Sequence, residues 1–146
     1  MSKYRVVEHT SKCSHIREYP RATATHQNEV LQLAVKQYIP LDSPIPQEGD
    51  ITFVATHANA MPKELYEPLW DDLQEACERA GLRIRSIWMA DVAHQGASYL
   101  LNEDKIGNNP HFNDHARDLY NMINEHSDEM PRPVVGLGHS MGCTSL

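Results

Sequence analysis

Near the end of the chain, a short apolar run leads directly into a serine flanked by glycines. The run is Val134-Val135-Gly136-Leu137, and Gly138-His139-Ser140-Met141-Gly142 follows it. This is the G-x-S-x-G pattern of a nucleophile elbow, a strained strand-to-helix turn that exposes a serine above a parallel sheet. The turn brings its two glycines so close together that a Cβ on either would clash. We predict that Ser140 lies on such a turn. The alternative is an ordinary glycine-rich turn.

Buried strands and helices alternate along the chain before this motif. The apolar run Ile51–Thr56 is typical of a strand buried on both faces, and Leu82–Met89 and Arg132–Leu137 are predicted as the next two strands. Apolar stripes at helical spacing predict helices over Leu65–Ala80 and Asp114–His126. This order indicates the α/β class, a mostly parallel sheet with helices on both faces.

The predicted core includes one stripe of each helix and both tryptophans. Gly81 is expected to end the first helix, and Asn113 to cap the second. The predicted inward-facing residues of the two helices are Leu69, Leu73, Ala76, Ala80, Leu119, Met122 and Ile123. Trp70 and Trp88 are expected to be core residues rather than substrate platforms.

The remaining segments are predicted as short strands and connections. Tyr4–Glu8 and His15–Tyr19 are expected to be extended, and Val30–Ile39 to be a half-exposed strand because apolar and polar residues alternate along it. Pro40–Asp50 is a proline-rich connection. Ala90–Asn113 is predicted as a long polar loop that contains at most one short helical turn.

Ligands of open α/β sheets bind beyond the carboxyl ends of the strands. Three predicted loops meet at that edge, namely His57–Ala60, Asp91–His94 and the serine turn. In a nucleophile elbow the backbone N–H that follows the serine helps to bind the oxyanion, together with an N–H from the first of these loops.

The oxyanion donors predicted in this way are Met141, Ala58 and Asn59. His57 either supports this oxyanion hole or is a loop histidine that hydrogen-bonds to backbone, and the sequence leaves both interpretations open. Ala58 stands where hydrolases often have glycine.

No metal site and no cofactor are predicted. His111 and His115 have a spacing that suits zinc, but a third ligand is missing, so a solvated pair is favoured. Gly136-Leu137-Gly138 resembles the start of a dinucleotide-binding motif, but Met141 stands where its last glycine belongs. A small nucleotide-binding domain is therefore only a third hypothesis.

Length and charge exclude several classes of protein. The chain has 146 residues, a net charge of −7 and no Lys/Arg cluster, so we expect a single domain, 1–146, that does not bind nucleic acid. No apolar stretch is long enough to span a membrane. Three widely spaced cysteines (Cys13, Cys77 and Cys143) predict no disulfide framework and an intracellular setting.

Six strings in collinear order carry a family resemblance. They are Ser14-His15-Ile16-Arg17-Glu18-Tyr19-Pro20, Pro62-Lys63-Glu64-Leu65-Tyr66-Glu67-Pro68-Leu69-Trp70, Ile87-Trp88-Met89-Ala90-Asp91, Asn102-Glu103-Asp104, Asp114-His115-Ala116-Arg117-Asp118 and Met130-Pro131-Arg132-Pro133. Together they resemble fungal α/β-hydrolases of the toxin-biosynthesis group, which includes the peroxisomal acyl-CoA hydrolase of mycophenolic acid formation. The resemblance implies an α/β-hydrolase fold and hydrolysis of a small-molecule ester or thioester, acyl-CoA included, with Ser140 as the nucleophile.

The triad of this fold runs serine, acid, histidine in chain order, yet only six residues follow Ser140. We therefore expect the N-terminal part of an α/β-hydrolase, truncated just after the elbow and inactive alone. Its last strand should leave an open edge that favours self-association. The alternative hypothesis is a non-catalytic remnant that serves as a binding or assembly module. The family is cytoplasmic or peroxisomal, and Thr144-Ser145-Leu146 is not a peroxisomal signal.

Overall fold

The computed structural model describes residues 3–14, 17, 19–43 and 45–146. These residues contain five strands, three α-helices and three short 3-10 helices. In chain order they are β1 (Tyr4–Lys12), β2 (Gln32–Pro40), β3 (Ile51–Thr56), η1 (Lys63–Tyr66), α1 (Glu67–Arg79), β4 (Ile84–Ala90), α2 (Gly96–Asn102), α3 (Asp114–Glu125), η2 (Ser127–Glu129), β5 (Val134–Gly138) and η3 (Ser140–Ser145).

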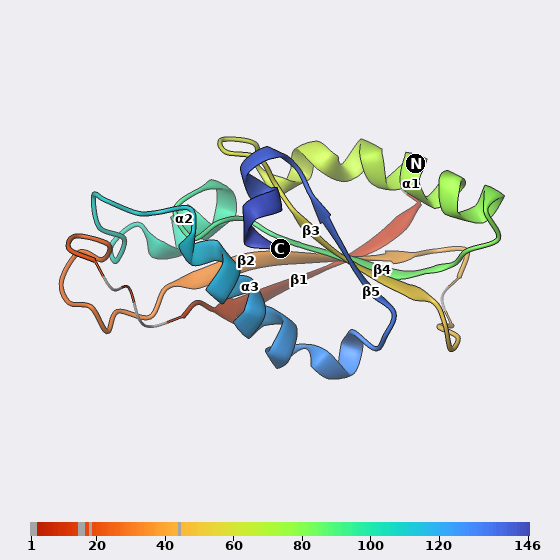
Figure 1. Ribbon diagram of the computed structural model, residues 1–146, viewed down its shortest axis with the longest axis horizontal. Coiled ribbons are helices and arrows are strands. Elements are labelled where there is room, and N and C mark those ends of the chain that lie inside the picture. Colours follow the sequence, from red (N-terminus) through yellow and green to blue (C-terminus); the bar gives the residue numbers. More distant parts are fainter. Residues whose placement is uncertain (1–2, 15–16, 18, 44) are drawn as a thin grey trace.

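The strands form one sheet in the order β1-β2-β4-β3-β5. β3 runs parallel to both β4 and β5, whereas β1 and β2 pair antiparallel with each other and β2 pairs antiparallel with β4. α1 and α3 are the crossovers of the parallel part, and they lie on opposite sides of the sheet (Figure 1). The predicted α/β class is confirmed. The carboxyl ends of β3, β4 and β5 share one edge, where the loops that follow them meet.

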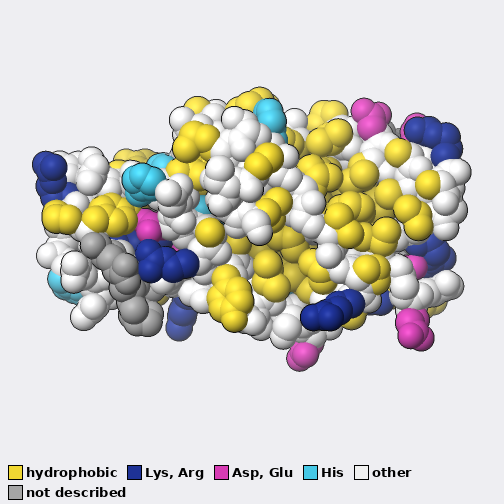
Figure 2. Space-filling model, in the orientation of Figure 1, with side chains coloured by type: hydrophobic (Ala, Val, Ile, Leu, Met, Phe, Trp, Pro, Cys, Tyr) yellow, Lys and Arg dark blue, Asp and Glu magenta, His cyan; other side chains and the backbone are white. Residues whose placement is uncertain are grey.

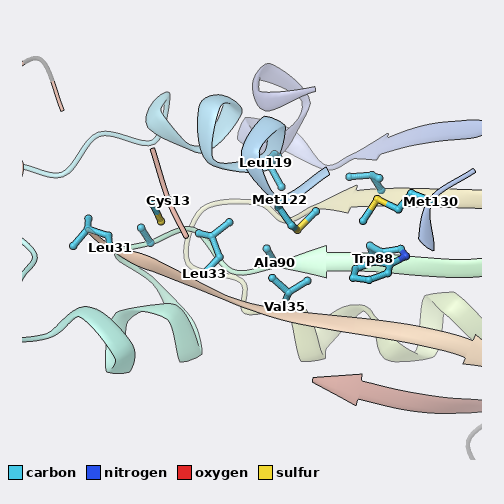
Figure 3. Close-up of a cluster of buried hydrophobic side chains, with 11 residues drawn as sticks. Cys13, Leu31, Leu33, Val35, Trp88, Ala90, Leu119, Met122 and Met130 are labelled. Carbon is cyan, nitrogen blue, oxygen red and sulfur yellow. The ribbon is translucent and has the colours of Figure 1, made fainter. Parts of the chain in front are cut away.

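Each face of the sheet carries its own apolar core. On the α3 side, Leu33, Val35 and Trp88 of the sheet pack against Leu119 and Met122 of the helix (Figure 3). These inward positions of α3 are as predicted, since both side chains are buried. The alternation predicted along β2 is confirmed by Leu33 and Val35, which share one buried face.

On the α1 side of the sheet, the residues of the helix that face the core differ from those predicted. Trp70 and Cys77 face the sheet, while Leu69, which was predicted to face inward, is 43% exposed. Trp70 is fully buried and stacks on Tyr66 of η1. The largest side chain thus occupies the inward position. Leu73 is partly buried against this core, as predicted, whereas Ala76 and Ala80, which were also predicted to face inward, are exposed. Gly81 follows the helix with a φ of +70°, which confirms it as the stop.

The helix α2 lies inside the segment predicted as loop. Hydrogen bonds from polar side chains fix α2 in place, so its sequence needs no apolar stripe. Ser98 Oγ donates to Asp91 O at 2.7 Å, and Asn102 Nδ2 donates to Gln32 O and Ala93 O. These contacts replace the apolar packing from which a helix is usually predicted.

Three boundary predictions are also corrected. β1 continues beyond the predicted Tyr4–Glu8 to Lys12, because all nine of its residues pair with β2. Of the segment predicted as extended at His15–Tyr19, residues 15, 16 and 18 lie outside the described residues, and Arg17 and Tyr19 are in no strand. Asn113 precedes α3 with helical backbone angles and forms no side-chain cap. Within the described part of the chain, none of the helices could span a membrane.

Candidate active site

Ser140 directly follows the last strand and has a strained backbone. Its φ is +54°, a left-handed conformation that is uncommon for a residue with a side chain. Such strain costs about 1–3 kcal/mol, and it persists only where neighbouring contacts impose it. Ser140 is exposed at the carboxyl end of β5, and η3 begins at this residue. The chain therefore makes a strand-to-helix turn at the predicted serine.

The two flanking glycines are required by close backbone contacts. A Cβ on Gly142 would lie 2.7 Å from the carbonyl oxygens of both Thr56 and His57, and one on Gly138 would lie 2.8 Å from Cys143 Cα. The predicted clashes are therefore present. Their partners differ from the prediction, because Gly142 packs against the end of β3 rather than against the other glycine.

Thr56, the last residue of β3, anchors the turn. Its carbonyl accepts the His139 N–H at 3.1 Å, and its Oγ1 donates to Gly142 O at 2.9 Å. These bonds join residues more than 80 positions apart. Hydrogen bonds from the last residue of β3 thus keep the turn at Ser140 in its strained conformation.

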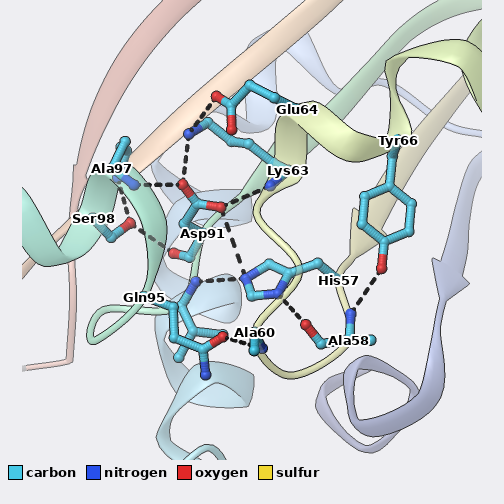
Figure 4. A network of polar contacts seen from close by, with 12 residues as sticks. His57, Ala58, Ala60, Lys63, Glu64, Tyr66, Asp91, Gln95, Ala97 and Ser98 are labelled. Atoms are coloured by element: carbon cyan, nitrogen blue, oxygen red, sulfur yellow. Dashed lines mark hydrogen bonds and ion pairs between the residues drawn. The ribbon is translucent and has the colours of Figure 1, made fainter.

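The loop that follows β3 is fixed by a buried histidine. Val92 N–H donates to His57 Nε2 at 2.9 Å, which places the ring proton on Nδ1, and Nδ1 lies 2.7 Å from Ala58 O (Figure 4). The ring is fully buried. Of the two interpretations left open by the sequence, the structure shows the hydrogen-bonded loop histidine. His57 also links the loop after β3 to the loop after β4, so these two loops do converge.

The three predicted oxyanion donors are in different situations. Ala58 N–H donates to the Tyr66 hydroxyl at 2.9 Å, and this hydroxyl lies 2.8 Å from His139 Nδ1. By contrast, no acceptor in the described part of the chain binds the N–H of Asn59 or of Met141. Those two N–H groups are free to bind a ligand.

A buried ion pair supports the same loops and was not predicted. The Asp91 carboxylate, at the end of β4, accepts from Lys63 Nζ at 2.7 Å and from the N–H groups of Lys63 and Ala97, each at 2.9 Å (Figure 4). Both charged side chains are buried. A Cβ on Gly96 would lie 2.4 Å from this carboxylate. The aspartate after an apolar strand and the glycine five residues later were the only signals in the sequence.

Comparisons with known proteins show what the chain is similar to. No protein-family model matches the chain. The chain is 52% identical to a type I acyl-CoA thioesterase, mpaH', of Penicillium brevicompactum over 141 residues, which is 96% of the chain and 32% of that protein. A type I acyl-CoA thioesterase of Penicillium roqueforti is 50% identical over the same shares. The chain spans about a third of the length of the curated relatives it matches. The predicted resemblance is confirmed.

A solved structure shows which fold this is. The peroxisomal α/β-hydrolase Lpx1 of Saccharomyces cerevisiae matches 97% of the chain and 39% of its own length, with a TM-score of 0.75 and 22% identity. The fold is that of an α/β-hydrolase. Within this fold the strained Ser140 lies at the carboxyl end of β5, a parallel strand at the border of the described sheet.

In the described structure, the Ser140 hydroxyl has no histidine as a hydrogen-bond partner. None of the described imidazoles forms a hydrogen bond with the Ser140 hydroxyl. His115 was predicted to be solvated beside His111, but it is fully buried, and neither ring nitrogen has a hydrogen-bond partner among the described residues. Burial lowers its pKa to about 3. Among the described residues, no cluster of metal-binding side chains is found.

A second buried ion pair joins the segment after β1 to α3. Arg17 Nη2 lies 2.9 Å from Asp118 Oδ2, and the Ser14 N–H donates to Asp118 Oδ1 at 2.9 Å. Both charged side chains are almost completely buried. Arg17 and Asp118 line a small cavity together with His94 and Tyr19.

Proposed function

We propose that this chain provides the nucleophile and the oxyanion hole of a serine-dependent acyl-CoA thioesterase. The observation that carries the proposal is the strained, exposed Ser140 at the end of β5, between two glycines that admit no Cβ. The thioester substrate is inferred from the Penicillium relatives, which are named acyl-CoA thioesterases. A cytoplasmic or peroxisomal location fits the yeast neighbour, which is named peroxisomal.

In this mechanism Ser140 Oγ attacks the thioester carbonyl carbon. The N–H groups of Asn59 and Met141 stabilise the oxyanion, the C–S bond breaks, and coenzyme A leaves as its thiol with the proton that a general base has taken from the Ser140 hydroxyl. Water then attacks the acyl-serine, which releases the carboxylic acid and restores the serine hydroxyl. Ala58 contributes by holding the loop, because its own N–H is engaged by Tyr66. The general base and the acid that orients it would come from the two-thirds of the relatives' length that this chain does not match.

A hybrid enzyme tests the proposal. We would replace the matching third of the Penicillium brevicompactum thioesterase with this chain and measure acyl-CoA hydrolysis. We expect turnover in the hybrid, none with Ser140→Ala, and none with the 146-residue chain alone. Ser145→Ala is the matched control. Ser145 lies in the same 3-10 helix as Ser140, and its hydroxyl has no hydrogen-bond partner among the described residues, so its removal should leave turnover intact. A folded hybrid that is inactive, or that keeps its activity without Ser140, would refute the proposal.

A binding or assembly module is the second candidate function, and the outer edge of β5 favours it. Among the described strands, β5 pairs only with β3, and the Pro133 carbonyl and the His139 N–H both face β3. The alternation of a strand therefore turns the backbone groups of Val134 and Gly136 outward. Such an edge is a template for another strand. A discrete complex with no Ser140-dependent turnover in the hybrid would favour this function.

A further inference from the structure

The Tyr66 hydroxyl lies between the two segments that carry the free N–H groups. It accepts the Ala58 N–H at 2.9 Å. The same hydroxyl forms a hydrogen bond with His139 Nδ1, 2.8 Å away. We assign the phenol proton to this bond, so that the hydroxyl accepts from Ala58 and donates to His139. One hydroxyl thus joins the residue before Asn59 to the residue before Ser140.

The position of this hydroxyl is set by the core rather than by the loops. Tyr66 is the last residue of η1 and is buried, and its ring stacks on the fully buried Trp70 with centroids 6.1 Å apart and planes 22° apart. Its phenol can therefore fix the positions of both loops instead of following them. His57 Nδ1 hydrogen-bonds to the carbonyl of the same residue, Ala58. Both the backbone N–H and the backbone C=O of Ala58 are therefore engaged.

We propose that Tyr66 is a positioning residue, which sets the separation between the Asn59 and Met141 N–H groups that receive the oxyanion. The inference rests on the proposed function. Oxyanion donors act only when they are held in place before the reaction begins. Without the Tyr66 hydroxyl, the Ala58 N–H loses its acceptor and His139 Nδ1 loses its donor. The loop after β3 and the turn at Ser140 are then no longer joined by this bridge.

The variant Tyr66→Phe keeps the stacking on Trp70 and removes only the bridge. In the hybrid enzyme we expect kcat to fall about 10-fold with KM unchanged, less than the 10²–10³-fold lost with an oxyanion donor itself. Tyr38→Phe is the matched control, because its buried hydroxyl binds Glu67 at 3.2 Å, away from the serine turn. Equal kcat values for Tyr66→Phe and the unchanged hybrid would overturn the proposal, as would an equal loss in Tyr38→Phe.

Variants of His139 separate positioning from general packing. His139→Leu removes the acceptor and should lower kcat as much as Tyr66→Phe, with no further loss in the double variant. His139→Asn retains an acceptor oxygen close to the backbone and should recover most of the activity. Additive losses in the double variant would show that the two residues act independently.

A measurement without catalysis keeps this inference separate from the proposed function. In NMR spectra of the 146-residue chain, Tyr66→Phe should move the Ala58 amide proton upfield and shift the Nδ1 resonance of His139, whereas Tyr38→Phe should change neither. An inactive hybrid together with these shifts would refute the thioesterase and leave the bridge established. Unchanged resonances would refute the bridge, whatever the hybrid does.

Discussion

Ser140 shows how a locally unfavourable conformation is imposed by distant residues. A positive φ at a serine costs about 1–3 kcal/mol, and each hydrogen bond from Thr56 returns about 1 kcal/mol. Two such bonds and the close contact at Gly142 hold the turn against β3. The serine is therefore held in its strained conformation before any substrate arrives.

A methyl group at Gly142 should break this arrangement. In Gly142→Ala the new Cβ would meet the carbonyl oxygens of Thr56 and His57 at 2.7 Å, and backbone atoms cannot move aside cheaply. We expect the free energy of unfolding to fall by about 1–3 kcal/mol in urea titrations, as for other overpacked sites. Gly136→Ala is the control, because its Cβ would meet only the end of the flexible Leu146 side chain at 3.3 Å. Equal stability of the two variants would contradict the prediction.

Residues of the site could be predicted from the sequence where their requirement is local. The glycines around Ser140 form a recognisable pattern because the turn itself demands them. Tyr66 could not be found in this way, since its partner His139 lies 73 positions further along the chain. The same is true of Lys63, whose partner Asp91 is 28 positions away. Only the fold brings these residues together.

At the scale of the elements, helices held by apolar packing were predictable and the helix held by polar contacts was not. α3 shows the regular apolar spacing of a half-buried helix, and its inward residues follow from that spacing. α2 depends on Ser98 and Asn102, which bond to backbone of other elements. In α1 the spacing predicted the helix, but the bulk of Trp70 decided which side faces the sheet.

The burial of His115 in α3 predicts a loss of stability in acid. Its pKa is about 3 in the folded chain and about 6.5 when unfolded, so the unfolded chain binds a proton first as the pH falls. Above pH 6.5, His115 is neutral in both states and does not lower the free energy of unfolding. As the pH falls from 6.5 toward 3, the free energy of unfolding decreases by up to about 1.4 kcal/mol per pH unit. Burial also lowers the pKa of His94, which adds to the slope with the same sign.

The variant His115→Leu should reduce this dependence on pH. It removes the titrating ring together with two buried nitrogens that have no partner, so stability at pH 7 should be maintained or raised. In urea titrations between pH 6.5 and 4, we expect the slope of stability against pH to become smaller. His26→Leu, which changes an exposed side chain, is the control. Slopes that are identical in His115→Leu and in the unchanged chain would contradict the assignment.

On the scale of the whole molecule, the sheet is covered on both faces but open at β5. Apolar side chains gather on the surface around this strand and α1 (Figure 2). The exposed apolar side chains of the chain include Leu69 of α1, Val134 and Val135 of β5, and Leu146. Monomeric proteins seldom leave a contiguous apolar patch beside an unpaired strand.

We therefore expect the 146-residue chain to associate through β5. Analytical ultracentrifugation should show a weight-average mass that rises with concentration above the 16.6 kDa of one chain. Charging the edge with Val134→Lys and Val135→Lys together should restore the monomer. Leu100→Lys, at a residue of α2 that is 69% exposed, should leave association unchanged. A chain that sediments as a monomer at every concentration would contradict this expectation.

The pairing of β3 with β5 also determines when the serine turn can form. About 80 residues beyond Thr56 must be synthesised before His139 and Gly142 can form their hydrogen bonds with Thr56. Contacts of such long range are slow to form, because the closure of a long loop comes first. The antiparallel ribbon of β1 and β2 can assemble early, but the strained serine must wait. We therefore expect the turn that carries the candidate chemistry to be among the last parts of the chain to fold.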